Sequence, residues 1–144
     1  MRADFQIQIQ LVDDAGAELK LDKVFIDALI YLQSNVRYTF SAGLTDSKGR
    51  LVVSFDQLEK IRLRNQAFSV MDYNTSLEDC DSTIGISVPS SATLRQRHEA
   101  IQKWFPDEAK LEVPNNNNLI LSNEVIIDID INRQSKVNLE IKKK

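Results

Sequence analysis

The sequence has few of the residues that build disulfides, metal sites and most acid–base catalysts. Among its 144 residues there is one cysteine, Cys80, and one histidine, His98. A single cysteine excludes an intrachain disulfide and any zinc site built from several cysteines. The four glycines leave no glycine-rich loop that could hold a phosphate group. These absences exclude several functions, and we expect no cofactor, no bound metal and no catalytic residue.

The sequence also lacks a basic excess and long apolar runs. Its formal net charge is −3, whereas proteins dedicated to nucleic acids or anionic membranes usually carry surplus positive charge. We therefore expect neither of these partners, and we interpret residues 142–144 (Lys-Lys-Lys) as a solvated tail. No apolar run approaches the ~18–20 residues that span a bilayer, and Met1 does not begin a signal peptide. We expect a cytoplasmic protein, although a secreted chain cloned without its signal would also begin with methionine.

The first half of the chain contains a strand–turn–strand unit twice. The first copy begins with residues 5–12, in which apolar and polar side chains alternate, and continues into the turn 13–16 (Asp-Asp-Ala-Gly). The second copy joins residues 37–44 to 50–55 across the turn 46–49, which predicts a hairpin. Asp favours such turns by accepting backbone hydrogen bonds, and Gly supplies the position with φ > 0. The alternation predicts half-buried strands.

In the first strand the apolar side chains share one face and the glutamines share the other, so we expect Phe5, Ile7, Ile9 and Leu11 to be buried. Residues 24–32 are more continuously apolar. A short helix is an alternative there, but the β-branched and aromatic residues favour a strand near the centre of the core. Further strands are predicted at 67–72, 83–88, 125–131 and 137–141, the last two as a final hairpin.

Two segments change to helical periodicity. Residues 56–65 predict a short helix with Asp56 as its N-cap. A second helix is predicted at 92–105, capped by Ser90 or Ser91 and ended by Pro106, with an apolar stripe of Leu94, Ile101 and Phe105.

A polar loop at 107–118 is expected to be flexible. The sequence therefore predicts one mainly β domain, 1–144: an antiparallel β-sandwich of about eight strands with two added α-helices.

The two turns carry a resemblance to a known group of proteins. Residues 13–19 (Asp-Asp-Ala-Gly-Ala-Glu-Leu) and 45–51 (Thr-Asp-Ser-Lys-Gly-Arg-Leu), each between strands, resemble the prealbumin-like β-sandwich superfamily. This group includes transthyretin-related proteins, CnaB-type repeats of Gram-positive surface proteins and carboxypeptidase regulatory-like domains. The resemblance covers roughly residues 5–55 and implies a prealbumin-like sandwich.

Two specialised activities of that superfamily depend on residues this chain lacks. CnaB-type domains often use a lysine of the first strand to form an intramolecular amide, but residues 5–12 contain none. Transthyretin-related hydrolases use several histidines and end in Tyr-Arg-Gly-Ser, whereas this chain has only His98 and ends in three lysines. The resemblance therefore implies a non-catalytic adaptor or interaction module, with a hydrolase of this type as the weakest alternative.

Three groups of residues are candidate sites for chemistry. Cys80 and His98 are the only thiol–imidazole pair, but Asp79 and Asp81 beside the cysteine disfavour a thiolate. Residues 72–79, within the acidic segment 72–81, resemble the start of a calcium loop, except that leucine replaces the loop glycine, so an acidic surface loop is the simpler interpretation. Asp128 and Asp130 alternate with isoleucines, which is typical of the solvent face of a strand.

The function predicted from these observations is the binding of another protein in an intracellular complex. The residues expected to contact the partner lie on the second helix or beside it: Trp104, Phe105, Arg95 and Arg97. Aromatic side chains near a helix end often anchor interfaces, although both rings could instead cap the core. A structural subunit of a larger assembly, such as a secretion or phage particle, is the alternative.

Overall fold

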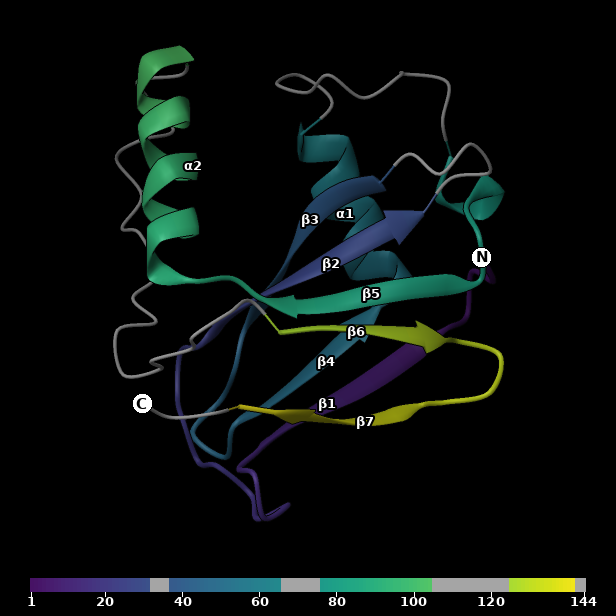
Figure 1. Cartoon of the computed structure of the whole chain (residues 1–144). Helices are drawn as coiled ribbons and strands as arrows, with labels where there is room; N and C mark the ends of the chain where they lie inside the picture. The colour runs from purple at the N-terminus through teal and green to yellow at the C-terminus, as the bar shows by residue number, and fades with distance from the viewer. Residues whose placement is uncertain (32–36, 66–75, 105–124, 142–144) are drawn as a thin grey trace.

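The computed structural model describes residues 1–31, 37–65, 76–104 and 125–141, and Figure 1 shows how they are arranged. The described chain is mainly β, with seven strands, two α-helices and one short 3-10 helix. The strands are β1 (Gln6–Val12), β2 (Phe25–Tyr31), β3 (Arg37–Leu44), β4 (Arg50–Ser54), β5 (Thr83–Val88), β6 (Val125–Asp130) and β7 (Lys136–Glu140). The helices are α1 (Phe55–Asn65), η1 (Leu77–Asp79) and α2 (Ser91–Trp104).

The strands form two sheets, as the sandwich prediction requires. One sheet has the order β4-β1-β7 and the other has the order β3-β2-β5-β6. All pairs are antiparallel except β1 and β7, which run parallel, so the prediction of a purely antiparallel sandwich was wrong at this pair. The predicted strand at 67–72 and the predicted flexible loop at 107–118 lie outside the described residues.

Both predicted hairpins were also wrong, because their strands belong to different sheets. β3 and β4 flank the turn at 46–49, yet β3 pairs with β2 and β4 pairs with β1. Likewise β6 pairs with β5, whereas β7 pairs with β1. A turn sequence fixes the local reversal of the chain but not the sheet that the next strand joins. Here the chain crosses at each turn between two layers that typically lie ~10 Å apart.

The facing predicted for the first strand is confirmed. Ile7, Ile9 and Leu11 of β1 are buried in the core between the sheets, as is Phe5 directly before the strand. β2 is a strand, not a helix, and it lies between β3 and β5 in its sheet. Its core-facing side chains are Ile26, Ala28 and Ile30, and those of β5 are Ile84, Ile86 and Val88.

The two helices differ in how they meet this core. α1 packs on β3 and β4 and closes that side of the sandwich. Phe55 and Leu58 are buried, and the Phe55 ring meets Phe5 edge-on with a centroid distance of 6.1 Å. The N-cap is Ser54 and not Asp56, because the Gln57 N–H donates to Ser54 Oγ at 3.2 Å. The Gln57 side chain also donates to the carbonyl of Ala42 on β3 at 2.6 Å. α1 thus contributes Phe55 and Leu58 to the hydrophobic core.

Candidate interaction site

The predicted partner-binding residues belong to α2, which begins where β5 ends. Pro89 follows β5, and Ser90 caps the helix: its Oγ accepts from the Thr93 N–H at 3.1 Å and lies 2.9 Å from Thr93 Oγ1. The Ser90 carbonyl accepts from the Leu94 N–H at 3.0 Å. The predicted serine cap is confirmed, and the helix bounds agree with the prediction to within one residue at each end.

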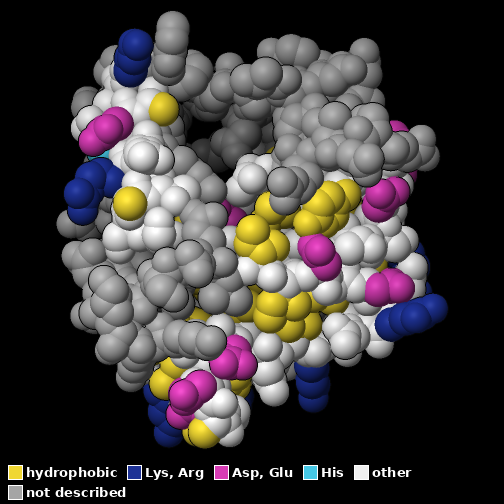
Figure 2. All heavy atoms as spheres, viewed as in Figure 1, with side chains coloured by type: hydrophobic (Ala, Val, Ile, Leu, Met, Phe, Trp, Pro, Cys, Tyr) yellow, Lys and Arg dark blue, Asp and Glu magenta, His cyan; other side chains and the backbone are white. Residues whose placement is uncertain are grey.

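Most described side chains of α2 are exposed. Among these described side chains only Leu94 is buried, at 5% exposure, and α2 packs on no described element as extensively as α1 packs on β3. Figure 1 shows α2 rising beside the sheets from the end of β5, and Figure 2 shows acidic and basic side chains along its outer side. The exposed positions are Ala92, Arg95, Gln96, Glu99, Ala100, Gln102 and Lys103.

Of the four predicted contact residues, Arg95 alone has a described side chain. Arg95 is exposed on α2. Arg97 and Trp104 belong to the helix, but their side chains are not among those described, and Phe105 lies outside the described residues. The roles of Arg97, Trp104 and Phe105 therefore stay predictions.

Cys80 and His98 are not brought together. Cys80 directly follows η1 and is buried, with its Sγ 3.5 Å from the carbonyl of Ser76. His98 is half-buried on α2. β5 runs between these two elements, and Figure 1 shows them at its opposite ends; six extended residues span ~20 Å.

The described part of the acidic segment 72–81 begins at Ser76. Leu77, which replaces the glycine of a calcium loop, is fully buried in the core, whereas Glu78 and Asp79 are exposed. Within the described ranges, no three His, Cys, Asp or Glu side chains are grouped so that they could hold a metal ion. Leu77 thus anchors the segment to the core.

One polar contact that the sequence did not predict crosses the outer face of the four-stranded sheet. The Tyr31 hydroxyl of β2 donates to Asp128 Oδ1 of β6 at 2.5 Å. Gly85 of β5 lies between them: a Cβ there would be 3.1 Å from the Tyr31 hydroxyl oxygen and 3.3 Å from Asp128 Oδ1. A glycine inside a strand is the only sequence signal for such a close approach. Asp128 is exposed, as predicted.

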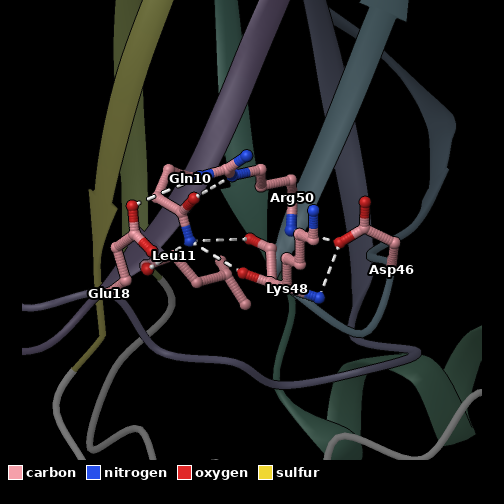
Figure 3. Close-up of polar contacts among 7 residues, drawn as sticks. Gln10, Leu11, Glu18, Asp46, Lys48 and Arg50 are labelled. Atoms are coloured by element: carbon pink, nitrogen blue, oxygen red, sulfur yellow. Dashed lines mark hydrogen bonds and ion pairs between the residues drawn. The ribbon is translucent and has the colours of Figure 1, made fainter.

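A second unpredicted contact group joins the two turns (Figure 3). Gln10 is buried although it belongs to the glutamine face of β1. Its Nε2 donates to the carbonyls of Leu11 at 3.1 Å and Lys48 at 3.0 Å, and its Oε1 accepts from Arg50 Nε at 2.6 Å. Arg50 also contacts Glu18 Oε1 at 3.3 Å. We call Gln10, Glu18, Lys48 and Arg50 the turn network.

The two turns themselves have the same internal hydrogen bonds. Asp13 Oδ1 accepts from the N–H groups two and four residues on, at 2.9 and 2.8 Å. Asp46 Oδ1 does the same at 2.8 and 3.0 Å. Gly16 and Gly49 occupy the fourth position with φ of 81° and 72°. The predicted turn chemistry is confirmed in both copies.

The carboxyl of Asp46, which begins the second turn, has a lowered pKa. The backbone N–H groups of Arg50 and Lys48 that donate to it hold its pKa below the ordinary value, and the positive charges of these residues act in the same direction. This carboxylate stabilises the turn by accepting the two backbone hydrogen bonds.

Three comparisons with known proteins place no constraint on this arrangement. Scans against protein-family models, curated proteins and solved structures each found no match. In the described part of the chain, no helix combines the length and apolar character needed to cross a membrane.

Proposed function

We propose that this chain is a non-catalytic β-sandwich that binds another protein through α2, as an adaptor in an intracellular complex. The observation that carries the proposal is the exposure of α2. The helix is capped and ordered at its start by Ser90, yet it contributes only Leu94 to the described buried residues. The exposed described positions of α2 leave a surface that can serve recognition.

The chemistry of the helix surface indicates the kind of partner. Arg95 and Lys103 lie on α2 together with Glu99, so the described surface carries charges of both signs. Mixed charge suits a polar protein surface better than a polyanion, which would favour a uniformly basic face. Trp104, if it faces outward, supplies the aromatic anchor that such interfaces often contain.

We also propose that the sandwich is prealbumin-like. This part of the proposal is supported by the two turns that carry the resemblance. Both have the same hydrogen bonds around Asp13 and Asp46, and both lie where the chain leaves the three-stranded sheet or returns to it.

The test is a matched pair of charge reversals on the two helices. Arg95→Glu changes the exposed surface of α2, and Lys60→Glu makes the same change at an exposed position of α1. Proteins that co-purify with the chain from its native cell are identified for both variants and the parent. We expect Arg95→Glu to remove a partner that Lys60→Glu retains, with melting temperatures equal for all three proteins.

The proposal is rejected if both variants retain the same partners as the parent. Trp104→Ala adds a second readout on the same helix. Loss of the partner without loss of stability supports docking, whereas a large fall in melting temperature assigns Trp104 to the core.

A further inference from the structure

A separate surface of the molecule is suited to a second copy of this chain. β7 is an edge strand of the three-stranded sheet and pairs only with β1 among the described strands. An edge strand presents unpaired backbone N–H and C=O groups that can bind another strand. The opposite side of the sandwich is different, because α1 packs on β3 and β4 there.

The backbone contacts of β7 show which of its groups face outward. The Ser135 carbonyl accepts from the Gln8 N–H, and the Ile141 N–H donates to the Val12 carbonyl, both at 2.8 Å. Backbone groups of successive residues in a strand alternate in direction. The odd-numbered residues of β7 therefore bond to β1, and the N–H and C=O groups of Lys136, Asn138 and Glu140 face away from it.

We infer that two copies of the chain pair antiparallel through β7, with a two-fold axis at Asn138. In this arrangement Asn138 lies opposite Asn138 of the second copy, and each Lys136 lies opposite a Glu140. These are the positions whose backbone groups face outward, so each opposed pair can exchange two backbone hydrogen bonds. All three side chains are exposed. The interface is the same patch on both copies, as two-fold symmetry requires.

The charge pattern selects β7 over the neighbouring edge strand β6. On β7, the two-fold axis sets a lysine opposite a glutamate twice, and opposite charges across an antiparallel pair are stabilising. On β6, an axis at Asp128 sets two Asp128 side chains opposite each other, and an axis at Ile129 sets Asp128 opposite Asp130. Like charges directly opposite are destabilising, so the acidic residues disfavour both of these registers on β6.

This inference goes beyond binding at α2, and it favours the alternative of a symmetric assembly. The three-stranded sheets of the two copies would join into one continuous sheet across the axis. The strand is five residues long, so we expect a weak, concentration-dependent dimer rather than an obligate one.

The test is a charge swap followed by analytical ultracentrifugation of the full chain from about 1 to 500 µM, a range chosen for weak dimers. The parent mass should rise from 16.4 kDa toward twice that value. Lys136→Glu sets glutamate opposite Glu140 and should weaken dimerisation at least about tenfold. The double variant Lys136→Glu/Glu140→Lys restores opposite charges and should recover the parent dissociation constant to within about threefold.

Each result decides the inference. A parent that stays monomeric at every concentration overturns it, as does a dimer that Lys136→Glu leaves unchanged. A dimer that weakens in the single variant but is not recovered in the double variant shows that residues 136 and 140 do not face each other, and this also overturns the pairing. Circular dichroism confirms that the variants are folded, which we expect because both side chains are exposed.

Discussion

At the end of the sandwich where the turn at residues 46–49 crosses between the sheets, polar side chains form hydrogen bonds with other parts of the fold, whereas most described side chains of α2 are exposed. In the turn network Gln10 donates to two backbone carbonyls, and Arg50 donates to the side chains of Gln10 and Glu18. On α2, only Leu94 of the described side chains is buried. The difference separates two uses of polar residues. The motif that is most conspicuous in the sequence serves folding, and the less conspicuous helix is the better candidate for recognition.

The two turns at this end of the sandwich, 13–16 and 46–49, have equivalent hydrogen bonds but different surroundings. Gly49 is buried: a Cβ there would lie 1.9 Å from the Leu19 carbonyl oxygen. Gly16 has no atom within 4 Å of the equivalent position. We therefore expect the glycine of the second turn to matter more for stability than that of the first, because the Leu19 carbonyl lies against it.

The largest expected effect is that of Gly49→Ala. The new methyl group meets backbone atoms that must move, and it adds the cost of φ > 0, so we expect a loss of about 3 kcal/mol or more in the free energy of unfolding. Urea unfolding measures this loss. A loss below about 1 kcal/mol would show that the second turn is not packed as described.

The next effect is that of Gln10→Leu. The change removes donors to the Leu11 and Lys48 carbonyls and the acceptor for Arg50, and we expect a loss of about 1–3 kcal/mol. Gln6→Leu is the matched control, because Gln6 belongs to the same strand face but is exposed. Equal stability of the two variants in urea unfolding would contradict a structural role for the turn network.

Gly16→Ala should have a smaller effect than Gly49→Ala, because only the backbone conformation opposes it. We expect a loss of about 1 kcal/mol. The ratio of the two losses is the sharper measurement, since both variants make the same chemical change at the same position of equivalent turns. Losses of equal size would mean that the positive φ alone accounts for the loss of stability in both variants, and that the Leu19 backbone moves aside at no cost in free energy.

The smallest effect is the pH dependence at Asp46. Its folded pKa lies below the unfolded value, so the unfolded state binds the proton first as the pH falls, and the contribution to stability is present above the unfolded pKa, near 3.8. It is lost as the pH falls through the folded pKa. Asp46→Asn should therefore be less stable than the parent at pH 7, and the difference should shrink below about pH 4. A difference that is independent of pH would contradict this account.

The sequence predicted the local structure well and the pairing of strands poorly. Alternation in β1 fixed which side chains are buried, and the Asp and Gly residues fixed both turns, because these depend on neighbours along the chain. Sheet membership of β4 and β7 depends on contacts with β1, which is distant in sequence, and no local pattern encodes it. The N-cap of α1 was misplaced because Ser54 also ends a strand.

The candidate site was predictable in part. The serine cap and the bounds of α2 follow from Ser90 and Pro106, and Arg95 is exposed on the helix. The turn network could not be predicted, since a glutamine at alternating spacing normally faces solvent. Gln10 is buried and bonds to Arg50, its cross-strand neighbour on β4, and this pairing joins strands distant in sequence.

Native-state hydrogen exchange of the isolated protein tests the contrast between the turn end and α2 most directly. We expect the amides of Leu11 and Leu19, which bond to the Gly49 and Leu11 carbonyls at 2.9 Å, to exchange only with an opening free energy close to that of global unfolding. The α2 amides from Gln96 to Lys103 should open locally, at a free energy lower by about 2 kcal/mol or more. If α2 is protected to the same level as Leu11 and Leu19, the helix belongs to the cooperative core, and its assignment as a surface recognition element is wrong.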